Sequence, residues 1–280
     1  MRVDRFLLLP LALMASSLEA QESPAPVADQ ILYLKQADVA LRDGRLTQAG
    51  QMITWLERNG DQVSGDDVAL LKAEYAIARM DVPAAAAALS AIKDGDRNIC
   101  RLEPAKAWVA ANSDAFDDAI IAMAKATRSC PDDASVWNLL GLVFIRKGEA
   151  EAASEAFAKA LAFAPEQPEI RNNYALALLQ KGELALANQQ LSIAARNAPT
   201  NTTILANLDF VSGMNGDAPR RNPMDDDAEW SARLISVAKG AKVAARTEQA
   251  TALFSQALLT LDHFDKEVWA EVSAPQDKRP

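Results

Sequence analysis

The chain has 280 residues, and its 29 basic and 38 acidic side chains give a formal net charge of −9 at pH 7. An acidic chain without a basic patch is poorly suited to bind phosphate backbones, so we expect no nucleic-acid partner. Half of the residues are apolar, 6% are aromatic, and β-branched runs of strand length are missing. This composition favours an all-helical protein.

Residues 1–20 have the pattern of a secretory signal peptide. Arg2 and Arg5 provide a positive start, residues 6–15 are mostly apolar, and small residues follow. The apolar segment is too short to span a bilayer, although an uncleaved membrane anchor is the alternative interpretation. We therefore expect an exported protein, located in the periplasm of a Gram-negative bacterium.

Cleavage is expected after Ala20 or, as the alternative, after Ser17. No cysteine lies near either site, so we expect no lipid anchor. The mature chain would begin with a linker over residues 21–29.

Residues 134–167 form a window in which small and aromatic residues occupy regular positions. Positions 4, 8, 11, 20, 24, 27 and 32 hold Trp137, Gly141, Phe144, Ala153, Phe157, Ala160 and Pro165. The small residues let two antiparallel helices approach closely, while Gly148 and Pro165 end the helices. This pattern resembles the 34-residue tetratricopeptide repeat (TPR). The resemblance implies an all-α, right-handed α-solenoid of stacked antiparallel hairpins.

The same period continues on both sides of this window with weaker matches. The array, residues 30–212, is expected to contain units 30–63, 66–99, 100–133, 134–167 and 168–201 and a capping helix over 202–212. In that helix Asp209 stands where the pattern requires Gly or Ala. Residues 213–229 are rich in Gly, Pro and Asp, and we expect a mobile linker there.

Beyond this linker we expect a divergent helical hairpin over residues 230–272 and a polar tail over 273–280. Asp226 and Glu229 predict a capping box at the start of the hairpin. Its second helix is expected to continue through Trp269.

The only two cysteines, Cys100 and Cys130, occupy positions 1 and 31 of one unit. The start of the first helix and the end of the second lie at the same end of an antiparallel hairpin, which predicts a disulfide in an oxidising compartment. The bridge would stabilise the fold by roughly 3 to 4 kcal/mol in the chain-entropy model. Two separate thiols at loop edges are the alternative, because position alone does not fix the Cβ direction.

Groups able to perform catalysis or hold a metal are scarce. His263 is the only histidine, and we interpret it as a solvated side chain at a helix end. Asp225, Asp226 and Asp227 lack the spaced glycine and terminal Glu of a calcium loop. The chain has no nucleophile elbow, phosphate-binding glycine loop or metalloprotease motif. We therefore expect no enzyme, no cofactor and no metal.

The first helix of each TPR unit lines a concave groove, and two pairs of asparagines recur there one repeat apart. These pairs are Asn138 with Asn172, and Asn173 with Asn207. An amide can both donate to and accept from a peptide backbone, and the resemblance to TPR proteins that hold extended peptides implies a peptide groove. The alternative is that these asparagines are only soluble groove residues or help repeats to pack. The candidate groove residues are Asn138, Leu142, Arg146, Asn172, Asn173, Leu176, Asn207 and Phe210.

Residues 170–178 and 207–217 look like parts of the TPR proteins of tight-adherence (Flp) pilus assembly systems. Those proteins are typically lipoproteins that aid a secretin, whereas this chain lacks the lipid-acceptor cysteine. We expect a non-enzymatic scaffold that binds a protein or extended peptide segment in its groove during envelope, secretion or pilus assembly. The alternatives are a structural or oligomerising envelope protein that uses its end hairpins, and a hydrolase or enzyme accessory, for which the catalytic groups are missing.

Overall fold

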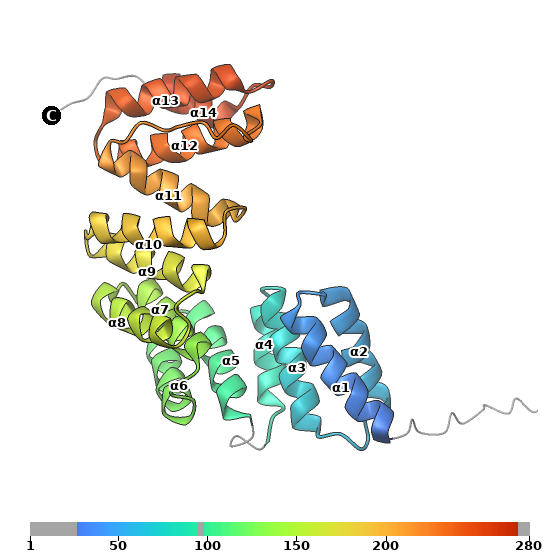
Figure 1. Cartoon of the computed structure of the whole chain (residues 1–280). Helices are drawn as coiled ribbons and strands as arrows, with labels where there is room; N and C mark the ends of the chain where they lie inside the picture. The colour runs from blue at the N-terminus through green and yellow to red at the C-terminus, as the bar shows by residue number, and fades with distance from the viewer. Residues whose placement is uncertain (1–26, 94–97, 274–280) are drawn as a thin grey trace, which may run out of the picture. The chain divides into compact units, whose positions relative to one another are not determined.

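The computed structural model describes residues 27–93 and 98–273, and every regular element in these ranges is an α-helix (Figure 1). The prediction of an all-α fold is therefore confirmed. The expected signal peptide lies outside the described residues. In chain order the helices are α1 (Val27–Arg42), α2 (Leu46–Asn59), α3 (Gly65–Ala78), α4 (Val82–Ser90), α5 (Ile99–Asn112), α6 (Phe116–Ser129), α7 (Ala134–Lys147), α8 (Ala150–Phe163), α9 (Pro168–Gln180), α10 (Leu184–Asn197), α11 (Thr202–Asn215), α12 (Asp227–Val243), α13 (Thr247–Thr260) and α14 (Lys266–Ser273).

The chain divides into two compact units, Met1–Val68 and Ala69–Pro280, with the boundary inside α3. In the first unit α1 packs against α2, and the rings of Tyr33 and Trp55 stack with their centroids 4.1 Å apart. Gln30 is fully buried. Its Nε2 donates to Asp61 Oδ1 at 2.8 Å, and its Oε1 accepts from the Gln62 backbone N–H at 2.9 Å. Both ends of this buried amide are therefore satisfied.

The second unit contains successive helical hairpins, in which α5 packs on α6, α7 on α8 and α9 on α10. Gly141 shows why the repeat needs a small residue at its eighth position. A Cβ added at Gly141 would lie 2.5 Å from Cε1 of the fully buried Phe157 ring. The neighbouring hairpins place alanine at this position, opposite smaller side chains at position 24. These pairs are Ala107 with Met123 and Ala175 with Leu191, all four fully buried.

The region after residue 201 differs from the sequence prediction. Helix α11 runs to Asn215, beyond the expected end of a capping helix, and α12 packs directly against it. The two helices run in the same direction, because Asp209 contacts Arg233 and Gly213 lies against Val237. A Cβ at Gly213 would approach the Val237 carbonyl oxygen to 1.9 Å. Helix α11 is therefore covered by α12 and does not end the stack.

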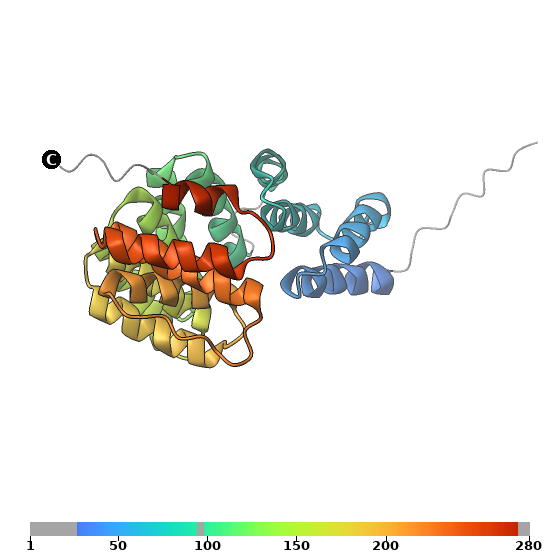
Figure 2. The same ribbon diagram turned by 90° about the horizontal axis from the view of Figure 1, so that it is seen from above.

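Residues 216–226 connect these two parallel helices by running back alongside them (Figure 2). This segment was expected to be a mobile linker. It is fastened to α12 by Arg233, whose Nη1 donates to Asp225 Oδ2 at 3.0 Å and to the Arg220 carbonyl oxygen at 3.2 Å. The predicted capping box of Asp226 and Glu229 is present at the start of α12.

The C-terminal end contains three helices where a hairpin was expected. Helix α13 ends at Thr260, and α14 begins separately at Lys266. Asp265 explains this second start, because its Oδ1 accepts from the backbone N–H groups of Glu267 and Val268 at 2.9 and 3.0 Å. A carboxylate in this position caps the first turn of a helix.

Candidate functional site

Helices α7, α9 and α11 place the four predicted asparagines in one continuous chain of hydrogen bonds. Asn207 Nδ2 donates to Asn172 Oδ1 at 2.7 Å, Asn172 Nδ2 donates to Asn173 Oδ1 at 3.4 Å, and Asn173 Nδ2 donates to Asn138 Oδ1 at 3.1 Å. We call Asn138, Asn173, Asn172 and Asn207 the asparagine chain. It links three consecutive repeats.

The two bonds between repeats join residues 35 apart, whereas members of each predicted ladder are 34 apart. These bonds therefore connect one ladder to the other. The reason lies on α9, where Asn172 and Asn173 are adjacent and differ by about 100° around the helix axis. Asn173 therefore reaches α7 while Asn172 reaches α11. The pair of adjacent asparagines on α9 is the feature of the sequence that indicates this connection between the two ladders.

Burial separates the members of the asparagine chain. Asn172 is 8% exposed, and Asn138, Asn173 and Asn207 are half-buried. The amide hydrogens of Asn138 and the amide oxygen of Asn207 have no hydrogen-bond partner among the described residues. The asparagine chain thus joins repeats through its middle members, while its two end members keep amide donors and an acceptor that make no hydrogen bond to the described residues.

The other predicted groove residues lie on the same helices but do not all have free side chains. Leu142 and Phe210 are half-buried and pack on the adjacent hairpin cores. Leu176 is half-buried. Arg146 is exposed, but its Nη1 donates to Asn112 Oδ1 at 2.8 Å and its guanidinium lies 5.8 Å from the centroid of the Phe116 ring. Arg146 therefore contacts the preceding repeat.

Two lysines that the sequence analysis did not single out make equivalent bridges between repeats. Lys147 Nζ lies 2.9 Å from Glu149 and 3.0 Å from Asp117 of the preceding repeat. Lys181 Nζ lies 2.9 Å from Glu183 and 3.0 Å from Glu151 of the preceding repeat.

Both bridges have the same electrostatic consequence. Hydrogen bonding to Glu149 and then to Asp117 raises the pKa of Lys147 above its usual value. Glu183 and then Glu151 raise the pKa of Lys181 in the same way. The signal in the sequence is a lysine followed two residues later by glutamate, repeated after one TPR period.

Cys100 and Cys130 form the predicted disulfide, with their Cα atoms 5.9 Å apart. Cys100 lies in the first turn of α5, and Cys130 directly follows α6. The bridge therefore closes the open end of this hairpin.

No cluster of three or more His, Cys, Asp or Glu side chains within residues 27–93 and 98–273 is placed to hold a metal ion. The His263 side chain is 67% exposed, and its Nδ1 lies 2.9 Å from Asp262 Oδ1. Of the helices that the structure describes, none combines the length and apolar character needed to cross a membrane.

Comparison with known proteins identifies the repeats. Residues 107–220 match the family described as the cytochrome c-type biogenesis protein H TPR domain. The comparison with curated proteins found no match to this chain in sequence.

Several solved TPR structures share the fold. A TPR protein of Thermus thermophilus is 20% identical, with a TM-score of 0.54 over 65% of this chain and 98% of that protein. The pilF protein of Pseudomonas aeruginosa is 19% identical, with a TM-score of 0.54 over 88% and 95% of the two chains. A TPR protein of Parabacteroides merdae is 11% identical, with a TM-score of 0.52 over 88% and 98%. The repeated hairpins, the family match over residues 107–220 and these structures show that the chain has a tetratricopeptide-repeat fold.

Proposed function

We propose that the protein is a non-enzymatic scaffold that binds an extended segment of a partner protein along the asparagine chain. The TPR fold is typical of scaffolds for protein–protein interaction. The observation that carries the proposal is the set of unused amide groups at the two ends of the asparagine chain, on Asn138 and Asn207. A peptide backbone presents both N–H donors and carbonyl acceptors, which these groups complement.

The hydrogen bonds already made in the asparagine chain strengthen this proposal. An amide fixed by its neighbours loses little side-chain entropy when a ligand binds, which favours affinity. Leu142, Leu176 and Phe210 lie on the same three helices and offer half-buried apolar surface beside the amides. The groove would therefore bind main chain through amides and apolar side chains through this surface.

We propose that the protein is exported and that this binding serves an assembly process in the periplasm. The signal-like residues 1–20 and the disulfide of Cys100 and Cys130 support that compartment. Envelope, secretion or pilus assembly is the process favoured by the resemblance of residues 170–178 and 207–217. The family match favours a second process, the biogenesis of c-type cytochromes, because it covers the same helices.

A second candidate function uses the C-terminal helices and not the groove. Phe264 and Trp269 are 69% and 50% exposed, and their ring centroids lie 6.0 Å apart. Exposed aromatic residues that lie together are typical of interfaces. This pair supports an oligomerising or structural role for α14.

Site-specific photocrosslinking tests the groove directly. A benzoylphenylalanine introduced at Leu176 should crosslink a periplasmic partner that mass spectrometry identifies. The same probe at Glu155, an exposed position on α8, is the matched control and should give no such product. Equal crosslinking from both positions, or crosslinking only from a probe at Trp269, would reject the groove and favour α14.

The affinity of the identified partner then tests the asparagine chain. Replacing both Asn172 and Asn173 with alanine should weaken binding at least tenfold. Because these residues also join repeats, circular dichroism must show that the variant remains folded. A folded variant with unchanged affinity would show that the asparagine chain is only a packing device.

A further inference from the structure

A pocket of about 370 Å³ lies between α11, the segment 216–226 and the first half of α12. It has a structural cause. A regular repeat would place a second helix after α11, but here residues 216–226 replace that helix and α12 packs on α11 directly. The two backbones touch at Gly213 and Gly240, and the pocket opens between the preceding turns, around Leu205 and Ala232.

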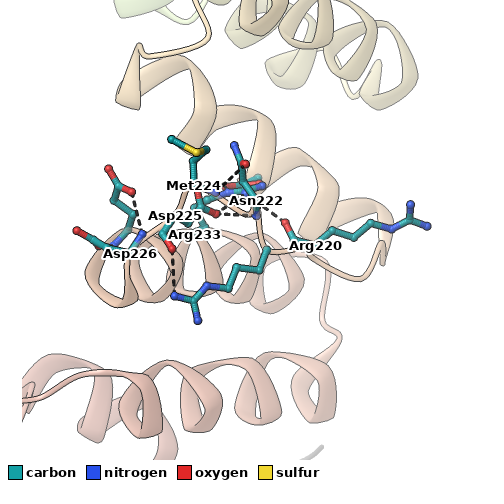
Figure 3. Close-up of polar contacts among 9 residues, drawn as sticks. Arg220, Asn222, Met224, Asp225, Asp226 and Arg233 are labelled. Carbon is teal, nitrogen blue, oxygen red and sulfur yellow. Dashed lines mark hydrogen bonds and ion pairs between the residues drawn. The ribbon is translucent and has the colours of Figure 1, made fainter.

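The polar wall of the pocket is built around Arg233 (Figure 3). Its Nε and Nη2 donate to the two carboxylate oxygens of Asp209 at 2.9 and 3.1 Å, and its Nη1 donates to Asp225 Oδ2 at 3.0 Å. The side chains of Asp209 and Asp225 are only 9% and 12% exposed. This buried network explains why Asp209 replaces the small residue of the repeat pattern, and it fixes the wall before any ligand arrives.

The charge of the wall is not balanced. Asp209, Asp225 and Glu229 line the pocket, whereas Arg233 is the one cation among its lining residues. Asp209 uses both oxygens on Arg233. Asp225 Oδ1 and Glu229 Oε1, in contrast, accept no hydrogen bond from the described residues. Two carboxylate oxygens of the lining residues are thus available to a donor.

The remaining wall is apolar. Leu205 and Ala206 contribute from α11, and Ala232 from α12. A volume near 370 Å³ falls at the lower end of the range of small-ligand pockets, so the pocket has room for one long side chain. A group with an aliphatic stem and a cationic end would match both parts of the lining.

We propose that this pocket binds a lysine or arginine side chain from a partner protein segment. The stem lies against Leu205, Ala206 and Ala232, and the cation bonds with Asp225 and Glu229. A donor paired with a carboxylate makes the stronger, charge-assisted type of hydrogen bond. The pocket lies beside α11 and does not include the asparagine chain, so this inference stands whether or not the groove binds a peptide.

Short capped peptides test the pocket without the groove. The full chain is titrated with acetyl-Ala-Arg-Ala-amide and acetyl-Ala-Lys-Ala-amide, while NMR follows the signals of Ala206, Met224 and Ala232. Both peptides should produce saturable shifts at these residues. The isosteric citrulline peptide, which lacks the charge, should bind at least fivefold more weakly.

Three variants locate the site. Ala232→Phe fills the pocket and should abolish the shifts, whereas Ala228→Phe, at another exposed position on α12 outside the lining, should preserve them. Glu229→Gln keeps the capping geometry and should weaken arginine binding several-fold. The proposal is overturned if shifts do not saturate, if citrulline binds as well as arginine, or if Ala232→Phe binds normally.

Discussion

Replacing Gly141 with alanine should destabilise the 134–167 repeat, although alanine is the better helix former. The new Cβ would lie 2.5 Å from Cε1 and 2.7 Å from Cδ1 and Cζ of Phe157. That ring is fully buried, so relief requires shifts of packed neighbours. Overpacking of this kind costs about 1 to 3 kcal/mol, and the helix propensity of alanine returns about 1 kcal/mol. We expect a net loss of up to roughly 2 kcal/mol.

A second substitution should reverse the sign of this effect. The next repeat pairs Ala175 with Leu191 at the equivalent positions, and both are fully buried. In the Phe157→Leu background the ring is gone, so Gly141→Ala should stabilise by about 1 kcal/mol through helix propensity. The coupling energy between the two sites is then about 1 to 3 kcal/mol.

Urea denaturation of the four proteins in this double-mutant cycle measures the coupling. Far-UV circular dichroism follows unfolding, and equal m-values confirm that the substitutions change stability and not the denatured state. An equal loss of stability from Gly141→Ala in both backgrounds would refute the steric explanation of the glycine.

Three further predictions concern other contacts. Reduction of the Cys100–Cys130 disulfide should lower the free energy of unfolding by roughly 3 to 4 kcal/mol, and alkylation followed by mass analysis should label two cysteines only after reduction. Asn172→Ala should cost about 1 to 2 kcal/mol in urea denaturation, because Asn207 Nδ2 loses its acceptor and Asn173 Oδ1 loses its donor; an unchanged midpoint would contradict the inter-repeat bonds. Hydrogen bonds from Gln30 and then Gln62 lower the pKa of Asp61 below its ordinary 3.8. The stability that this carboxylate contributes is present above pH 3.8 and is lost as the pH falls through its lower, folded pKa; NMR titration should show the pKa rising toward 3.8 in Gln30→Leu.

The hairpins could be predicted because their contacts repeat along the chain. Gly141 and Phe157 mark a close helix–helix contact within one repeat, and the same positions recur with Ala175 and Leu191. Such contacts are local in sequence, so a period of small and large residues suffices to place them.

The region beyond α11 could not be predicted for the opposite reason. Asp209 was recognisable as a misfit, but its partner Arg233 is 24 residues away and follows no repeat. A buried carboxylate requires a partner, so the misfit itself was the available signal. The close approach of α11 and α12 at Gly213 and Gly240 is likewise unique to one pair of helices, and no periodicity indicates it.

For the candidate groove, the sequence indicated which asparagines lie on neighbouring helices but not which of them form hydrogen bonds with one another. Spacing by one repeat suggested two independent ladders, whereas the bonds join Asn173 to Asn138 and Asn207 to Asn172. The difference depends on the position of each side chain around the axis of α9, which residue spacing alone does not specify.

The lysine bridges have a consequence for how this protein can change its length. Lys147 bonds with Asp117 of the repeat before it, and Lys181 bonds with Glu151 in the same way. Residues 134–167 therefore carry both halves of this junction, a lysine for the preceding repeat and a carboxylate for the following one. A tandem duplication of that segment would meet a copy of itself with matching charges, so the lysine bridge would be preserved at the new junction. The glycine contact between α11 and α12 has no such complementary copy, and growth by duplication would stop there.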